Sequence, residues 1–533
     1  MSEMPNRRAV LGAGIALAGT TALASPVHAA SPARTPSAAR AADRYVTPDG
    51  PEVREAEARR GAGPLRRVSL TATASRLELG GGLTVPTWSY GDRLPGRTVR
   101  VTAGDRLALT LANHLPQSTT VHWHGLSVRN DMDGVPGLTQ RPIEPGAEFA
   151  YRFAVTQPGT YWLHSHSGVQ LDRGLYAPLI VDDPREPLAY DREWVVVLDD
   201  WLDGIDGSTP DAVFDELTDG RGGGHGTAPE HGTAAGRGTA PEHGTAATGG
   251  DAPSRLPADA DSDLLGGHAG NVAYPHYLVN GRRASAPSVF EARPGDRIRL
   301  RVINAGGDTP FRLALGGHRM TVTHSDGFPV QHTETGALLL GMGERYDVLV
   351  TAGDGVFPLT ALAEGKGASA LAVLRTAPGA LPPAGVRPKE LDGPVLTAGR
   401  LAADESVALP AREPDRTVRF SLTGSMKRYD WAFDGRPYDP AVRRPVRAGE
   451  RVRLVFENRT SMWHPLHLHG HTFALTGADG RRSPGARKDT AAILPRRSLT
   501  VDLDADNPGL WMLHCHNLYH AESGMMTVLG YLR

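Results

Sequence analysis

A ten-residue pattern that occurs three times constrains the fold of this 533-residue chain more than any other feature. The pattern reads Gly-(Asp/Glu)-Arg-apolar-x-Leu-x-apolar-x-Asn and covers residues 104–113, 295–304 and 449–458. Each copy is a turn followed by alternating apolar residues, which is the period-two pattern of a strand with one buried face. Three copies therefore predict three homologous β domains.

The composition agrees with short strands and excludes some functions. With 63 Gly and 42 Pro, the chain is rich in turn residues, which is typical of β-sandwiches and not of long helices. We expect a mostly β protein of three consecutive Greek-key sandwich or barrel domains. The formal net charge of −2 argues against a nucleic-acid partner, which needs a clustered basic field. Because Cys515 is the single cysteine, no intramolecular disulfide can form.

The repeats and the changes in composition also predict domain limits. We expect a first domain at 63–187, a middle domain at 188–388 and a third domain at 389–533. A flexible leader is expected at 30–62, which is rich in Ala, Arg and Pro and has no periodicity. A Gly/Ala/His-rich insertion at about 220–254 has too little apolar surface to fold, so we expect disorder there. Its histidines are interpreted as solvated linker residues, with weak metal binding as the alternative.

Residues 1–29 have the features of an export signal. Arg7 and Arg8 precede an apolar run at 9–18, and small residues near position 29 suit cleavage. Paired arginines before such a run resemble a bacterial twin-arginine signal, which exports folded proteins. The run is too short to span a membrane, and no later stretch qualifies. We expect a protein without a membrane span that is extracellular, cell-wall associated or periplasmic.

Histidines fall at matching places in the first and third domains. Pairs follow Asn113 and Asn458 by the same nine and eleven positions, and a second pattern, Pro-Gly-x-aromatic-x-Leu-His-x-His, occurs once in each domain. The four His-x-His pairs are His122/His124, His164/His166, His467/His469 and His514/His516. The middle domain has Leu313 and Leu315 at the first offsets, so we expect it to be a spacer without metal ligands.

Such pairs are suited to metal binding. Residues i and i+2 of a strand point to the same face, so each pair projects two imidazoles into one space. Burying eight imidazoles without a metal would be costly, and imidazole favours copper, zinc, iron or nickel. If the first and third domains meet, the pairs form one multinuclear metal site between them.

The third domain carries a second candidate site. Cys515 lies between two of the paired histidines, and the surrounding segment adds His464, His520 and Met525. The corresponding residues of the first domain are Ser165, Thr119, Gln170 and Leu175. Two histidines, one thiolate and a weak thioether make the ligand set of a mononuclear blue-copper electron-transfer centre.

These residues together resemble the four copper-binding motifs of the multicopper oxidases, in the copper-resistance and laccase-like branch of bacterial three-domain members. The resemblance implies three cupredoxin-like domains and four copper ions: one type 1, one type 2 and two type 3. It implies type 1 ligands His464, Cys515, His520 and Met525, and type 2 ligands His122 and His467. It implies type 3 ligands His124, His164 and His516 for one copper and His166, His469 and His514 for the other.

The resemblance also implies a reaction and its catalytic groups. The type 1 copper would accept single electrons, and Cys515, which is bonded in sequence to His514 and His516, would give them a short route to the cluster, where O2 is reduced to two waters. Asp133 resembles the family's acid beside the cluster. Glu522 is a second candidate, although many members place the acid one position earlier, where this chain has Ala521. Glu522 is therefore interpreted as a proton donor or as a rim carboxylate.

The electron donor is the least constrained part of the function. The branch favours Cu(I) as the reductant in copper tolerance, although only 10 Met are present and Cu(I)-capturing members often have more. Laccase-type oxidation of phenols or aromatic amines is the alternative, and a non-catalytic copper-binding protein is a distant one. The expected partners are O2 and a small reductant or Cu(I). A monomer is expected because both halves of the cluster lie in one chain.

Overall fold

Each copy of the ten-residue repeat forms a strand that begins directly after a turn. The three strands are β4 (Arg106–His114), β15 (Arg297–Asn304) and β27 (Arg451–Asn458). Gly104, Gly295 and Gly449, which open the copies, have φ values of +98°, +87° and +85°. Glycine tolerates this left-handed region without steric cost, which explains its place in the pattern.

The asparagine of each copy holds the chain that follows the strand. The side-chain amides of Asn113, Asn304 and Asn458 each donate to backbone carbonyls of later loops. Their Oδ1 atoms accept from the backbone amide two residues ahead. The sequence repeat is therefore also a structural repeat, with the same turn, strand and anchor in three domains.

The computed structural model describes residues 44–219, 252–257, 260–476 and 485–533. The expected export signal and nearly all of the expected insertion at 220–254 lie outside the described residues. No helix in the described part of the chain has the length and apolar character needed to cross a membrane.

The first domain contains two four-stranded sheets, in the orders β2-β1-β4-β6 and β3-β8-β7-β5. Besides β4, its strands are β1 (Leu65–Glu78), β2 (Thr84–Tyr90), β3 (Val99–Thr102), β5 (His122–His124), β6 (Glu148–Ala154), β7 (Gly159–His164) and β8 (Tyr176–Asp182). The short helices η1 (Asn130–Met132) and η2 (Gln170–Arg173) lie in its loops.

The middle domain contains a seven-stranded sheet, β13-β12-β9-β15-β20-β17-β18, and a six-stranded sheet, β14-β22-β21-β16-β19-β23. Besides β15, its strands are β9 (Arg192–Trp201), β12 (His276–Val279), β13 (Arg282–Arg283), β14 (Ser288–Glu291), β16 (Phe311–Leu315), β17 (Met320–Ser325), β18 (Phe328–Thr335), β19 (Ala337–Leu340), β20 (Arg345–Thr351), β21 (Val356–Ala363), β22 (Ala368–Arg375) and β23 (Val395–Leu396). Its smaller elements are α3 (Pro210–Thr218), the hairpin β10 (Asp261–Ser262) and β11 (Gly267–His268), η4 (Asp263–Leu265), η5 (Lys389–Asp392) and η6 (Ala398–Arg400).

The third domain contains a six-stranded sheet, β25-β24-β27-β32-β29-β30, and a five-stranded sheet, β26-β34-β33-β28-β31. Besides β27, its strands are β24 (Arg416–Thr423), β25 (Ala432–Phe433), β26 (Arg443–Val446), β28 (His464–Leu468), β29 (Phe473–Leu475), β30 (Arg487–Lys488), β31 (Thr490–Ile493), β32 (Ser498–Asp504), β33 (Leu510–Cys515) and β34 (Met526–Tyr531). The helix α4 (Leu518–Glu522) follows β33.

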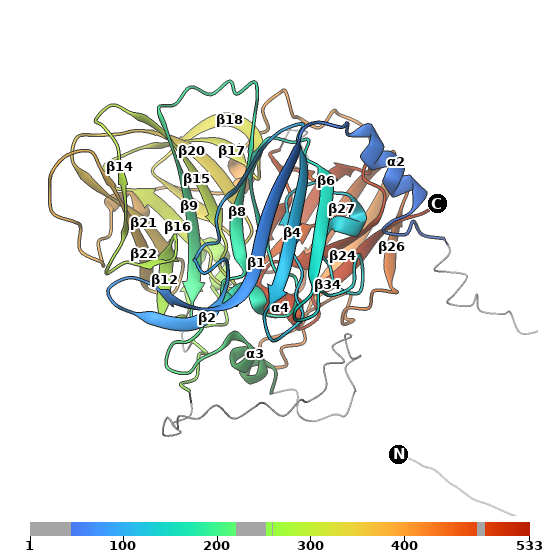
Figure 1. Cartoon of the computed structure of the whole chain (residues 1–533), viewed down its shortest axis with the longest axis horizontal. Helices are drawn as coiled ribbons and strands as arrows, with labels where there is room; N and C mark the ends of the chain where they lie inside the picture. Colours follow the sequence, from blue (N-terminus) through green and yellow to red (C-terminus); the bar gives the residue numbers. More distant parts are fainter. Residues whose placement is uncertain (1–43, 220–251, 258–259, 477–484) are drawn as a thin grey trace, which may run out of the picture. The chain divides into compact units, whose positions relative to one another are not determined.

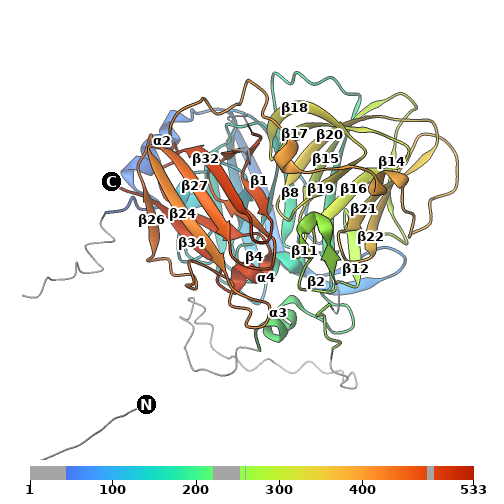
Figure 2. The same cartoon turned by 180° about the vertical axis from the view of Figure 1, so that it is seen from behind.

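The protein is thus mostly β, with three consecutive cupredoxin-like sandwiches, as the repeat predicts. Figures 1 and 2 show the strands of the first domain (blue to cyan) beside those of the third (orange to red), with the middle domain (green to yellow) next to both. Strand β7 of the first domain contacts β15 and β20 of the middle domain, and β18 of the middle domain contacts β30 of the third. These contacts decide which residues can meet between domains.

The expectation of a flexible leader at 30–62 is wrong for its described part. Residues 51–59 form the helix α2 (Pro51–Arg59), and Tyr45 pairs with Leu532 in an isolated bridge. Val46 and Val53 are each only 2% exposed. The Ala/Arg/Pro composition concealed these two apolar residues, whose burial against the domains compensates the ordering of the segment.

Candidate metal centre

Strand pairing brings the four His-x-His pairs together in two steps. In the first domain, β5 and β7 pair antiparallel with His122 opposite His164. In the third domain, β28 and β33 pair with His467 opposite His514. The two domains then face each other, so that their imidazole nitrogens form three groups with all ligand atoms within 4.8 Å: His122/His124/His467, His124/His164/His516 and His166/His469/His514.

The hydrogen bonds of these rings leave lone pairs that face one another. His122 Nδ1 bonds the carbonyl of Asp133 and His467 Nδ1 bonds that of Asp489, at 3.0 Å each. Both rings must therefore donate from Nδ1, and their Nε2 atoms, 3.4 Å apart, both present lone pairs. Because a metal–nitrogen bond is about 2.0–2.1 Å long, this pair can share one metal ion.

The same arrangement recurs at the second pair of facing nitrogens. His514 Nδ1 donates to the Cys515 carbonyl (2.8 Å) and His469 Nδ1 to Asp133 Oδ2 (2.9 Å). Their Nε2 atoms lie 3.1 Å apart and again face each other with lone pairs. His166 completes this group, with its ring centroid 5.0 Å from that of His469.

The third group has nitrogens without any partner. His124 Nδ1, His164 Nε2 and both ring nitrogens of His516 are buried and make no hydrogen bond within the described structure. His164 Nδ1 donates to the Ser165 carbonyl at 2.8 Å, so its lone pair is on the unpartnered Nε2. Orphaned lone pairs in a buried cluster are costly unless a metal binds them, so the residues present fit copper.

Burial also keeps these imidazoles in the form that binds metal. Desolvation lowers the pKa of His467 below its usual range and holds the pKa values of six further cluster histidines well below it: His124, His164, His166, His469, His514 and His516. Neutral imidazole is the form that coordinates a metal ion. The cluster therefore does not repel a cation at neutral pH.

A second site lies in the third domain around the single cysteine. Cys515 Sγ is 3.7 Å from Nδ1 of His464 and 3.7 Å from Nδ1 of His520, and these two nitrogens are 3.1 Å apart. His464 Nε2 bonds Thr460 Oγ1 (2.9 Å) and His520 Nε2 bonds Asn271 Oδ1 (2.6 Å). Both Nδ1 lone pairs therefore point toward the sulfur.

The protonation states at this site also fit a metal ion. Burial lowers the pKa of His464 to about 3 and that of His520 well below its usual range. Burial, with a smaller contribution from the Asp308 carboxylate, raises the pKa of the Cys515 thiol, so a metal ion is needed to hold it as a thiolate. Met525 is fully buried, and its backbone carbonyl accepts from the Cys515 amide at 3.1 Å.

The middle domain is more than a spacer, contrary to the prediction from its missing histidine pairs. Its Arg345 is fully buried and forms two hydrogen bonds to the Asp489 carboxylate, at 2.7 and 2.6 Å. Asp489 Oδ1 in turn lies 3.1 Å from Nε2 of His124. This contact fixes the proton of His124 on Nε2 and leaves Nδ1 for the metal, which is how outer groups orient metal-binding histidines.

The middle domain also reaches the cysteine site. Asn271 Oδ1 accepts from His520 Nε2, and Asn271 Nδ2 donates to the thioether of Met426 at 2.8 Å. Lys366 and two backbone amides anchor the neighbouring Asp308, which holds Asn517 in the loop before α4. His520 is completely buried, so Asn271 covers the ring edge that points away from the sulfur.

The two predicted acids are near different histidines of the cluster. Asp133 is completely buried and bonds rings of both domains, as described for His122 and His469. Glu522 lines a cavity of about 20 Å³ together with His164, His166 and Cys515. Burial raises the pKa of Glu522 to about 7. Although many family members are expected to carry the acid at the position of Ala521, Glu522 at the next position still lines this cavity.

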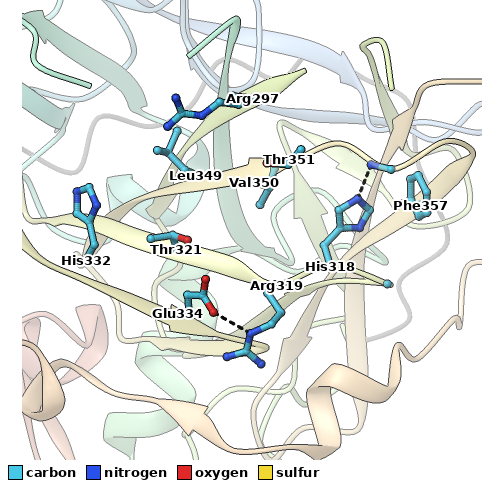
Figure 3. A pocket seen from close by; sticks show the side chains of 12 residues that line it. Arg297, His318, Arg319, Thr321, His332, Glu334, Leu349, Val350, Thr351 and Phe357 are labelled. Carbon is cyan, nitrogen blue, oxygen red and sulfur yellow. Dashed lines mark hydrogen bonds and ion pairs between the residues drawn. The ribbon is translucent and has the colours of Figure 1, made fainter. Parts of the chain in front are cut away.

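A larger cavity on the middle domain, of about 540 Å³, contains no comparable donor set. Figure 3 shows its charged residues spread around the rim, with Arg319 paired to Glu334. Both nitrogens of His318 are used: Nδ1 bonds the Gly316 carbonyl and Nε2 accepts from the Gly353 amide. This cavity is therefore unsuited to metal chemistry.

Asp489, Arg345 and Asn271 are functional candidates that the sequence did not reveal. Each lies outside the His-x-His patterns, and each acts across a domain boundary. No local pattern predicts such contacts, because they depend on how the domains pack. Only the copy of the repeat at 295–304 indicated that the middle domain shares the architecture of its neighbours.

Comparison with known proteins supports one family over nearly the whole chain. Multicopper oxidase family models match residues 71–186, 193–379 and 411–531. The multicopper oxidase MmcO of Mycobacterium tuberculosis is 46% identical over 99% of this chain and 97% of that protein. A copper resistance protein A homolog of Pseudomonas syringae pv. tomato is 29% identical over 81% of this chain and 87% of that protein.

A solved structure of a laccase is also similar to this chain in fold. The crystal structure of the laccase from Botrytis aclada has a TM-score of 0.69 and 25% sequence identity, and the match covers 88% of each chain. Members of this family carry four coppers, of types 1, 2 and 3, which agrees with the two donor sets described above. With its three matched domains and both donor sets, the chain belongs to the multicopper oxidase family.

Proposed function

We propose that this multicopper oxidase oxidises Cu(I) outside the cytoplasm and thereby contributes to copper tolerance. The observation that carries the proposal is the surface of the cysteine site. His464 and His520 are fully buried, and Asn271 caps the outer edge of His520. Within the described residues, no face of His520 is open to a phenol ring. The group beyond Asn271 is the thioether of half-buried Met426, a soft ligand that suits Cu(I).

The donor geometry and the family resemblance together support an assignment of ligands, in which Met525 is included on the resemblance alone. We assign type 1 copper to His464, Cys515, His520 and Met525, type 2 copper to His122 and His467, and the type 3 pair to His124/His164/His516 and His166/His469/His514. When bound, these coppers supply one-electron transfer and four-electron reduction of O2. Cys515 is bonded in sequence to His514 and His516, so it offers a continuous covalent route between the two sites.

Two carboxyls are assigned different roles. Asp133 is a positioning residue, because it accepts from rings of both domains and fixes which of their nitrogens face the cluster. Glu522 is assigned as the group that holds and delivers protons. Its pKa of about 7 allows both forms near neutral pH, and its cavity adjoins His164 and His166.

The cellular setting is also part of the proposal. Relatives named for copper resistance support a role in copper tolerance. Arg7 and Arg8, before the apolar run at 9–18, support twin-arginine export to the periplasm, cell wall or exterior. We propose a monomer, since a single chain contains every residue assigned to copper.

Oxygen uptake by copper-loaded protein tests the donor. Cu(I) and a methoxyphenol are compared at equal concentrations, in wild type and in Met426→Leu, which keeps the size of the side chain and removes the sulfur. The proposal predicts faster uptake with Cu(I) and a loss of that preference in Met426→Leu. Met320→Leu, in the core of β17, is the matched control and should keep the preference.

Laccase-type oxidation of phenols is the second candidate, because the laccase of similar fold carries that name. It would be favoured if the phenol drives faster uptake than Cu(I) and Met426→Leu has no effect. Copper-loaded protein that takes up no oxygen with either donor would contradict oxidase activity and favour a copper-binding role.

A further inference from the structure

A second cavity, of about 570 Å³, lies where α2 meets the first and third domains. Its wall includes Arg59 and Arg60 at the end of α2 and Arg487 of β30. Asp506 is the only carboxylate among its described lining residues. Arg59 and Arg60 pair with Glu55 and Glu57 of α2, at 3.9 and 3.2 Å, so Arg487 is the guanidinium of this wall that has no ion pair among the described residues. A cation without an ion pair in a concave surface attracts anions.

Arg487 forms no ion pair with a carboxylate of the described residues, and the nearby charges of Asp506 and Asp504 only partly oppose the lowering of its pKa by burial. Its Nη2 donates to Thr472 Oγ1 at 2.6 Å, and its guanidinium lies 5.3 Å from the ring centre of Phe328. Its Nε is buried and has no hydrogen-bond partner, and no carboxylate of a described residue forms an ion pair with it. Burial lowers the pKa of Arg487. A desolvated cation with an unused donor is unfavourable unless an anion binds there.

Arg60, which lines the same cavity, is also held in place. Its Nη2 donates to Asn507 Oδ1 at 2.9 Å, and its Nη1 donates to Glu57 Oε2 at 3.2 Å. Glu57 is shared, because its other oxygen accepts from the backbone amide of Ala154. Burial lowers the pKa of Arg60 as well. The cavity therefore presents two oriented guanidinium groups from segments that are far apart in sequence.

We propose that this cavity binds a small oxyanion, a phosphate or a dicarboxylate, between Arg60 and Arg487. Planar guanidinium groups match the paired oxygens of such anions. The wall also includes Gly125, directly after His124, and Thr472, directly after His471. A bound anion thus joins α2 to the two domains that hold the cluster. This site is independent of which electron donor the enzyme uses.

Calorimetric titration of the copper-loaded full chain tests the site. Phosphate and succinate are titrated separately at constant ionic strength set with sodium chloride. The proposal predicts saturable binding of at least one of them at one site per chain, and the two arms decide between phosphate and carboxylate. Because charge-assisted hydrogen bonds are lost, Arg487→Gln and Arg60→Gln should each weaken binding by about tenfold or more.

Arg76→Gln is the matched control, since Arg76 is an exposed arginine on β1 outside this cavity. It should bind like the wild type. Arg487→Lys keeps the charge without the planar fork and should fall between wild type and Arg487→Gln, which also covers the case that Arg487→Gln does not fold. Absence of saturable binding in the wild type, or unchanged binding in Arg60→Gln and Arg487→Lys, would overturn the proposal.

Discussion

The first and third domains place different side chains at the same position of the fold, beside the second His-x-His strand of each domain. In the third domain it holds His464, Cys515 and His520, whose lone pairs converge on one point. The corresponding residues of the first domain are Thr119, Ser165 and Gln170. These also converge, but as a closed hydrogen-bond network, with Thr119 Oγ1 and Ser165 Oγ each 2.8 Å from Gln170 Oε1.

This difference shows what the fold supplies and what the residues supply. Both domains bring three side chains to one buried point beside a His-x-His strand. In the first domain their hydrogen bonds are satisfied internally, so a metal ion has nothing to bind. In the third domain the single thiol hydrogen of Cys515 can serve only one of the two nitrogens that face it, whereas a metal ion satisfies both nitrogens and the sulfur. One architecture therefore serves as structural support in one copy and as an electron-accepting site in the other.

The largest effect is expected from removing the sulfur. Cys515→Ser removes the ligand and the covalent route to the cluster, so oxygen uptake with any one-electron donor should be lost. The copper content should fall from four ions to three per chain. Ser165→Ala, at the matched position of the first domain, should keep both values. Oxygen uptake that persists in Cys515→Ser would contradict the assignment of Cys515 to electron transfer.

Arg345→Met should weaken the cluster from the middle domain. It leaves the Asp489 carboxylate buried without its cation, which costs about 3–5 kcal/mol, and frees His124 to rotate. We expect about 10–100-fold weaker copper retention in competition with a chelator. Arg299→Met is the control, because Arg299 is equally buried and bonds Asp347 but touches no histidine of the cluster. Equal copper loss in both variants would show that Arg345 acts on the stability of the fold and not on the orientation of His124.

Asn271→Ala should change which donors reach the type 1 site. It uncovers the edge of His520 and removes the contact with Met426. The ratio of phenol to Cu(I) turnover should rise by about tenfold, which corresponds to ~1.4 kcal/mol. Asn280→Ala removes an asparagine elsewhere in the middle domain and serves as the control. An unchanged ratio would show that Asn271 does not limit access.

The smallest effect concerns stability alone. Gln170→Ala leaves the hydroxyls of Thr119 and Ser165 without their shared acceptor, which should lower the free energy of unfolding by about 1–3 kcal/mol. Because this network binds no metal, copper content and oxygen uptake should not change. Thermal unfolding and copper analysis check both parts. A loss of copper without a loss of stability would contradict the structural role of the network.

The sequence predicted the parts of the protein that follow from local spacing. The Gly of each repeat and the alternating apolar residues after it predicted a turn and one strand, and the period-two pairs predicted which histidines share a face. The roles of Arg345 and Asn271 could not be predicted, because each acts through a side chain of another domain. The ordered structure of residues 44–62 could not be predicted for a similar reason, because Val46 and Val53 are buried by residues that are distant in the sequence.

Crystallographic location of copper by anomalous scattering tests the central claim most directly. The account predicts four copper peaks per chain in loaded protein. One should lie between His464, Cys515 and His520, three should lie among the His-x-His pairs, and none should lie beside Ser165. A copper at the Thr119–Gln170 network, or an empty Cys515 site in an active enzyme, would contradict it.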